Sequence, residues 1–129
     1  MIIMPGRAPD TVPSTNRSDT FTGTVWADPV LPTQDGVTIA NIFFAPGART
    51  FWHHHELGQI LHLVAGRGLV CSAGGAVEVL RPGDVVWVPP GERHWHGAAH
   101  DSYLVHLAIS LGTTVWGDEV HHTCSDHEE

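Results

Sequence analysis

Four histidines of this chain stand in two pairs, and in each pair one residue separates the two imidazoles. The first pair is His53 and His55, and the second is His94 and His96. Both pairs lie in stretches typical of β-strands, where residues two apart point to the same face. Each pair can therefore direct two imidazoles to one point, and neutral imidazole is the commonest metal ligand in proteins. The spacing predicts a site for one divalent metal.

The chain around these pairs consists of short β-prone stretches separated by turns, and none shows a sustained 3.6-residue apolar period. The turns are marked by Ala45-Pro46-Gly47, Gly74-Gly75, Arg81-Pro82-Gly83 and Pro89-Pro90-Gly91. We expect strands near residues 21–26, 37–44, 49–55, 59–64, 68–71, 77–80, 84–88, 94–96 and 103–109. Many short strands joined by Gly/Pro turns indicate an all-β sandwich or barrel.

Length and composition limit the classes of function. With 129 residues the chain predicts one domain, which we divide into a flexible arm (1–20), a barrel (21–111) and an acidic tail (112–129). Fourteen acidic against six basic residues argue against nucleic acid as a partner. No stretch approaches the roughly 18 apolar residues of a membrane span, and no secretory leader is evident. The two cysteines suggest no disulfide framework, so we expect a cytoplasmic protein with reduced thiols.

The histidines belong to two blocks with regular spacing. The first block contains Gly47, His53, His55, Gln59 and Gly66, and the second contains Gly83, Pro89, Gly91 and His94. In order and spacing the blocks resemble the two motifs of the cupin superfamily, whose fold is a double-stranded β-helix, or jelly-roll barrel. The resemblance implies that His53, His55, Gln59 and His94 hold the metal.

Two positions depart from the usual cupin motifs. Gln59 replaces a glutamate, and Ala98 replaces the final asparagine of the second motif. An amide keeps an oxygen donor but leaves the metal its full double positive charge, which strengthens its Lewis acidity. Three imidazoles and one oxygen suit Mn, Fe, Ni, Cu or Zn, so the donor set alone does not select the metal.

A narrower resemblance covers residues 21–109. The matching segments are residues 21–25, 46–50, 57–59, 82–87, 94–99 and 106–109. They are similar to the manganese-dependent, cupin-type hydroxynitrile lyases of bacteria, in which a glutamine is the fourth ligand and two further histidines stand beside the metal. The resemblance implies one manganese ion, with Fe, Ni or Zn as alternatives, and a lyase that cleaves or forms cyanohydrins.

The two further histidines are His96 and His106. Strand alternation places His96 on the face of His94, and His106 on the face of Leu104 and Ala108. An imidazole can take and give a proton near neutral pH. In the lyase hypothesis His96 removes the hydroxyl proton of the cyanohydrin, and His106 stabilises or protonates the departing cyanide. A structural role remains open for each of them.

Two other classes of function fit the same residues, because a fold does not settle a function. One is an iron- or manganese-dependent oxygenase that uses open metal positions for O₂. The other is a cupin that binds a small molecule or a metal without catalysis. In every case we expect a small-molecule ligand and a homo-oligomer, either a dimer or a tetramer.

Several other residues carry weaker expectations. His54 and His62 alternate with inward positions, so they should lie on the surface, whereas Ala40 and Ile42 should form an apolar pocket wall. Trp52 and Trp95 should point away from the cavity, into a partner subunit. The tail residues His121, His122, Cys124 and His127 match no four-ligand zinc motif, and we expect no second metal site there.

Overall fold

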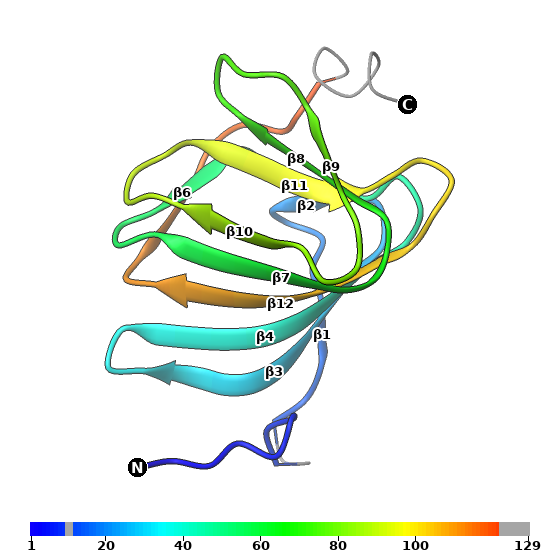
Figure 1. Ribbon diagram of the computed structural model, residues 1–129. Helices are drawn as coiled ribbons and strands as arrows, with labels where there is room; N and C mark the ends of the chain where they lie inside the picture. Colours follow the sequence, from blue (N-terminus) through cyan, green and yellow to red (C-terminus); the bar gives the residue numbers. More distant parts are fainter. Residues whose placement is uncertain (10–11, 122–129) are drawn as a thin grey trace.

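The computed structural model describes residues 1–9 and 12–121 and arranges them as two curled antiparallel sheets facing each other (Figure 1). The strands are β1 (Thr15–Asn16), β2 (Phe21–Thr22), β3 (Val25–Gln34), β4 (Val37–Phe44), β5 (Arg49–Thr50), β6 (His53–His55), β7 (Gln59–Gly66), β8 (Gly68–Ser72), β9 (Glu78–Leu80), β10 (Val85–Val88), β11 (His94–Ala98), β12 (Leu104–Leu111) and β13 (Thr114–Trp116). The all-β jelly roll expected from the sequence is confirmed.

The first sheet has the strand order β1-β3-β4-β12-β7-β10. The second has the order β13-β6-β11-β5-β2, and β8 also pairs with β11 and β9. Strands distant in sequence become neighbours, as when β12 lies between β4 and β7. Residues that are far apart in the sequence therefore lie together in the space between the two sheets.

Alternation along the strands places the apolar core between the sheets. On β7, for example, Leu61 and Leu63 are buried whereas His62 and Val64 are exposed. The members of this core are Phe21, Val25, Ala27, Ile42, Phe44, Ala48, Leu61, Leu63, Leu80, Ala98, Leu104 and Ala108. Burial of these side chains supplies the main driving force for closing the two sheets.

A second apolar cluster lies on the outer face of the second sheet. Trp95 points away from the cavity, as expected, but it is fully buried by Leu69, Cys71, Val77 and Val120 of its own chain. Trp52 packs against the same cluster. The expectation that Trp95 enters a partner subunit is therefore wrong, because no part of its side chain remains exposed for such a contact.

The chain beyond each predicted barrel boundary takes part in the sheets. Residues 15–16, placed in the flexible arm, form β1 and pair with β3, and residues 114–116, placed in the tail, form β13 and pair with β6. We therefore extend the sheet structure beyond residues 21–111. Among the residues that the structure describes, no helix is long and apolar enough to span a membrane.

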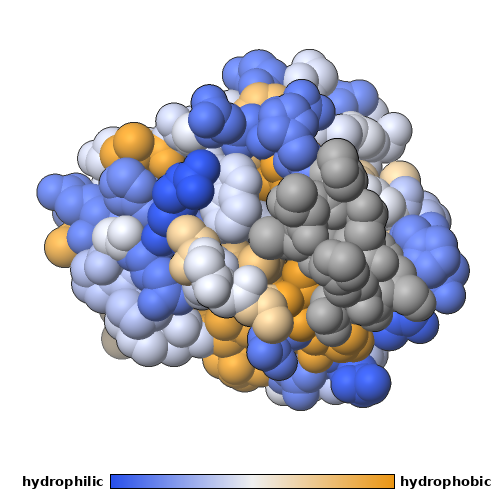
Figure 2. Space-filling model, turned by 90° about the horizontal axis from the view of Figure 1, so that it is seen from above, coloured by the Kyte–Doolittle hydropathy of each residue, from blue (hydrophilic) through white to orange (hydrophobic). Residues whose placement is uncertain are grey.

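The molecule carries exposed hydrophobic side chains as well as its buried clusters. Among hydrophobic residues of the strands, the largest exposed fractions are those of Val85 (64%), Trp87 (54%) and Val64 (52%). These residues lie on β7 and β10 of the first sheet. Seen from above, the surface is mostly hydrophilic, and hydrophobic residues gather toward the lower edge of the view (Figure 2). The homo-oligomer expected from the sequence stays a prediction.

Candidate metal centre

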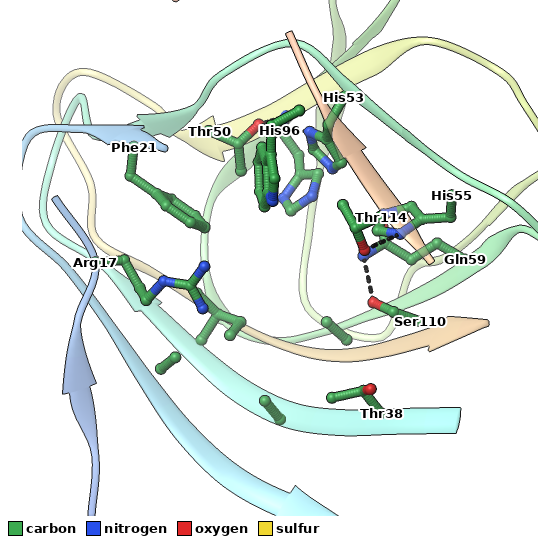
Figure 3. Close-up of a pocket in the computed structure, with 15 residues that line it drawn as sticks. Arg17, Phe21, Thr38, Thr50, His53, His55, Gln59, His96, Ser110 and Thr114 are labelled. Carbon is green, nitrogen blue, oxygen red and sulfur yellow. Dashed lines mark hydrogen bonds between the residues drawn. The ribbon is translucent and has the colours of Figure 1, made fainter. Parts of the chain in front are cut away.

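The two histidine pairs face each other across neighbouring strands. His53 on β6 and His94 on β11 are direct partners in the sheet register, so the same side of the sheet carries His55 and His96 as well. All four side chains are almost completely buried. The ring centroid of His53 lies 4.3 Å from that of His94, 5.0 Å from that of His55 and 5.2 Å from that of His96. The four rings therefore surround one interior point. Figure 3 shows three of them, those of His53, His55 and His96.

The Nδ1 atom of each imidazole contacts a fixed partner. Nδ1 of His53 donates to the carbonyl oxygen of Phe51 (2.8 Å), and Nδ1 of His94 donates to that of Glu92 (2.9 Å). Nδ1 of His55 lies 3.0 Å from the hydroxyl of Thr114. Such contacts fix the tautomer and the ring orientation, and they are the usual second layer around metal-binding histidines. The Nε2 atoms of the three rings are thereby left available as donors to a metal.

Gln59 and His94 provide the sharpest evidence that the site suits a cation. Gln59 Nε2 donates to Ser110 Oγ (3.1 Å), which directs Oε1 of the same amide to within 3.1 Å of His94 Nε2. Because His94 Nδ1 donates to a carbonyl, the Nε2 of the neutral ring carries a lone pair, not a proton. Two acceptors then face each other, and a metal ion bound to both would remove their repulsion. The donor set therefore fits a divalent metal.

The protonation of the histidines agrees with this interpretation. Burial lowers the pKa of His55 to about 4 and lowers the pKa of His94. Burial is also the main reason that the pKa of His53 lies well below its usual value. Imidazoles that remain neutral at physiological pH are ready to bind a metal, because only the neutral form has a free lone pair.

His96 lies as close to the site as its neighbours do. Its ligand atom and those of His53 and His94 all lie within 4.8 Å of one another, so these three buried histidines can hold one metal ion. Nε2 of His96 and Nε2 of His55 are buried with no hydrogen-bond partner among the described residues. The structure thus brings together His53, His55, Gln59 and His94, as the sequence predicts, with His96 beside them.

His106 enters the site from the opposite sheet. It lies on β12, fully buried, and its Nε2 is 2.9 Å from Nδ1 of His96. Burial lowers the pKa of His106 to about 4 and, as the largest cause, lowers that of His96 well below its usual value. Both imidazoles are therefore neutral at rest, and they share one proton along their contact.

Irregular backbone positions these residues. The register between β7 and β12 shifts between Val105 and His106, which is the signature of a β-bulge. Gly58, with φ +101°, precedes Gln59 directly, and a Cβ there would lie 2.8 Å from the carbonyl oxygen of Val88. Gly97 follows His96, and a Cβ there would lie 2.4 Å from the carbonyl oxygen of Ala48. Only glycine permits such close approach of strands on both sides of the site.

A pocket of about 200 Å³ opens from the histidines. Its wall includes Ala40 and Ile42, as expected from the sequence, together with Ala27 and Ala108. Figure 3 shows the polar residues that also line it, and they are Arg17, Thr38, Thr50, Ser110 and Thr114. The volume is below the 300–1,000 Å³ typical of sites for drug-sized ligands, so the pocket suits a small molecule.

Sequence reasoning missed several residues of this site. Ser110 follows Ala108 by two positions, so strand alternation was a usable signal for it. Thr50 accepts from the backbone N–H of His96 (3.3 Å), but it belongs to a different strand. Thr114 and Arg17 lie outside the predicted barrel, where no pattern in the sequence indicates that the chain returns to the site.

The expectations for the remaining histidines have different outcomes. His62 is exposed, as its position out of phase with the ligand histidines predicts, whereas His54, also expected on the surface, is half-buried. The tail positions His122, Cys124 and His127 lie outside the described residues, and His121 is exposed. The expectation of no second metal site in the tail therefore stays a prediction.

Comparisons with known proteins agree with the fold and the site. The cupin domain family matches residues 41–110, which include the two histidine pairs, Gln59 and His106. A protein named (R)-mandelonitrile lyase, from Granulicella tundricola, is 53% identical over 94 residues, which cover 71% of this chain and 72% of that protein.

Solved structures show the same architecture. A cupin-like protein from Thermotoga maritima is 34% identical, with a TM-score of 0.83 over 93% of this chain and 100% of its own. A polyketide cyclase from Streptomyces resistomycificus, 19% identical, has a TM-score of 0.70 over 97% of this chain and 92% of its own, and shares the fold alone. With its two motifs, its jelly-roll sheets and these relatives, the chain belongs to the cupin family and resembles the bacterial hydroxynitrile lyases within it.

Proposed function

We propose that this protein is a divalent-metal-dependent hydroxynitrile lyase, which cleaves a cyanohydrin to an aldehyde and hydrogen cyanide or forms it from them. The observation that carries the proposal is the His96–His106 pair, which stands beside the donor cluster at the inner end of a small pocket. The relative named (R)-mandelonitrile lyase supports it. A Lewis-acid site and an adjacent neutral base are what this reaction needs.

The proposed ligands are His53, His55, Gln59 and His94, and the proposed metal is manganese. When bound, the metal would act as a Lewis acid that lowers the pKa of the substrate hydroxyl. Neutral Gln59, in place of a carboxylate, would leave more of the positive charge for that purpose. Ser110 and Thr114 would keep the amide and the imidazole of His55 directed at the ion.

His96 is the proposed general base. If its Nδ1–H donates to His106 Nε2, the Nε2 of His96 is left with a free lone pair and no hydrogen-bond partner among the described residues. His106 then carries its own proton on Nδ1, an atom that is buried with no hydrogen-bond partner among the described residues. When His96 takes the hydroxyl proton, His106 Nε2 stabilises the resulting imidazolium as its hydrogen-bond acceptor.

The bond changes balance without any further reactant. His96 takes the hydroxyl proton, the oxygen electrons form the carbonyl double bond, and the bond between the two carbons breaks. Its electron pair leaves with cyanide, and the proton held by His96 returns to cyanide to give hydrogen cyanide. The apolar wall formed by Ala40, Ile42 and Ala108 would hold the side chain of the aldehyde and exclude water from the step.

The decisive experiment is mandelonitrile cleavage under anaerobic conditions by protein reconstituted with Mn²⁺, with metal content measured on the same sample. We expect metal-dependent release of benzaldehyde without oxygen. A fully metallated sample that releases none would refute the lyase proposal. Turnover that requires oxygen would instead assign the site to an oxygenase, and tight ligand binding without turnover would assign it to a binding protein.

A further inference from the structure

Arg17 is a cation that belongs to the pocket and has no role in the mechanism above. It follows β1 in the N-terminal arm, is half-buried, and lines the pocket together with the histidines. Figure 3 shows its guanidinium pointing into the pocket, with Phe21 beside it. The Cζ atom lies 5.4 Å from the centroid of the Phe21 ring, which is cation–π distance.

The arm that carries Arg17 is attached to the barrel at several points. Thr15 and Asn16 pair with β3, and the backbone N–H of Arg17 donates to the carbonyl oxygen of Val25 (2.9 Å). Further along β3, Asp28 accepts from Arg7 (2.8 Å) and from Ser14 (2.7 Å). These contacts hold the backbone of residues 14–17 against β3. The position of Arg17 is therefore set by the fold.

The charge of Arg17 has no counter-charge in the pocket. Among the residues described by the structure, no aspartate or glutamate lines the pocket, and no hydrogen bond or ion pair of the Arg17 side chain occurs. Arg7 and Arg67, by contrast, are paired with Asp28 and Asp101. Glu119, which does not line the pocket, accepts a hydrogen bond from Thr22 Oγ1 (2.8 Å). A guanidinium offers five donors, and here the edge not stacked on Phe21 faces a cavity.

We propose that Arg17 binds a carboxylate on the substrate, so that the preferred substrates are small hydroxynitriles, or their aldehydes, with an acid group at the end remote from the reacting carbon. This inference rests on the proposed function and names its substrate class. Arginine binds a carboxylate through two parallel N–H···O contacts, which gives orientation as well as affinity. The cavity of about 200 Å³ leaves room for one ring or a short chain between Arg17 and the histidines.

A substrate with a carboxylate also needs a cation in the pocket for electrostatic reasons. The chain carries a formal net charge of −8, which repels anions at long range. Inside an apolar wall, an unpaired carboxylate would lose its hydration without compensation. A local cation offsets both effects. An arginine that served only to pack on Phe21 would have no influence on which substrates the enzyme prefers, and this difference makes the proposal testable.

The test compares two substrates in the manganese-loaded enzyme, mandelonitrile and its 4-carboxy derivative. We expect R17Q to lower the ratio of kcat/KM for the acid to kcat/KM for mandelonitrile by about 10- to 100-fold, because hydrogen bonds to charged groups have that strength. R17K keeps the charge but loses the two parallel N–H···O contacts, so its kcat/KM ratio should lie between those of the wild-type protein and R17Q. The matched control R81Q changes an exposed arginine of the β9–β10 turn and should leave the ratio unchanged. An unchanged ratio in R17Q would overturn the proposal.

A binding measurement separates this inference from the proposed reaction. Binding of 4-carboxybenzaldehyde, without cyanide, is measured by calorimetry for the wild-type protein and R17Q. Weaker binding by R17Q, with benzaldehyde bound equally by both, supports carboxylate recognition even in a protein that cleaves no cyanohydrin. Mandelonitrile cleavage together with equal binding of the acid by both proteins would overturn the role of Arg17 and leave the lyase proposal intact.

Discussion

His96 and His106 come from opposite sheets, yet Nδ1 of the first lies 2.9 Å from Nε2 of the second. Both rings are shielded from solvent, and each keeps one nitrogen without a hydrogen-bond partner among the described residues. The pair can hold one proton between its rings while Nε2 of His96 stays without a partner and is able to accept another. This relationship leads to the first two predictions.

Replacing His96 with alanine should lower kcat by about 10²- to 10⁴-fold, the usual contribution of a general base. The metal content should stay at the wild-type level, because the four proposed ligands remain. Cleavage rates and metal content would be measured on the same preparation, with His62→Ala as the control on an exposed histidine. Loss of the metal from the His96 variant would show that His96 is a ligand, as its distances to His53 and His94 also permit.

His106 should act through His96, so the effects of the two residues should not add. His106→Asn should slow cleavage because the imidazolium of His96 loses its acceptor. The double variant His96→Ala/His106→Asn should then be no slower than His96→Ala alone, as expected for residues that act as a unit. A double-mutant cycle on kcat measures this coupling. Multiplicative losses would mean that His106 contributes independently, for example by protonating cyanide.

Thr114→Val should weaken metal binding by about 10- to 100-fold, because the hydroxyl of Thr114 is the partner of His55 Nδ1. Valine has nearly the same shape, so the strand should be preserved. Competition with a chromogenic chelator measures the affinity. Thr113→Val, at the adjacent exposed position, is the matched control. Equal affinities in the two variants would contradict a positioning role for Thr114.

The stability of the metal-free protein should fall as the pH decreases from about 6.5 toward 4. His106 has a pKa of about 4 in the folded state, because burial disfavours its charged form, and about 6.5 when unfolded. Between these values the unfolded chain binds a proton that the folded chain does not, so protonation favours unfolding. Urea unfolding at a series of pH values, with a chelator present, measures the effect.

The variant His106→Asn provides the comparison for that experiment. It removes one buried titratable group, so its free energy of unfolding should depend less steeply on pH in the same range. His62→Asn, at an exposed position, should retain the wild-type slope. A steeper slope in the His106 variant would be inconsistent with a neutral, buried imidazole at this position.

Much of the site was predictable because strand alternation is a local property of the chain. Whatever the partners of a strand, residues two apart point to one side, so His53 with His55 and His94 with His96 had to share faces. The same rule placed Ala40 and Ile42 in the pocket and His62 on the surface. The Gly/Pro turns likewise marked the ends of β4, β8, β9 and β10, since their backbone requirements are local.

Pairing between distant strands was not predictable in this way, because it depends on which surfaces can be buried together. β13 pairs with β6 and brings Thr114 to His55, although three residues of strand carry almost no pattern. The docking of the arm on β3, which directs Arg17 into the pocket, rests on contacts with Val25 and Asp28. Similarly, Val120 covers Trp95 only after the sheets have formed. The local sequence thus sets the faces of the strands, whereas non-local packing decides what each face meets.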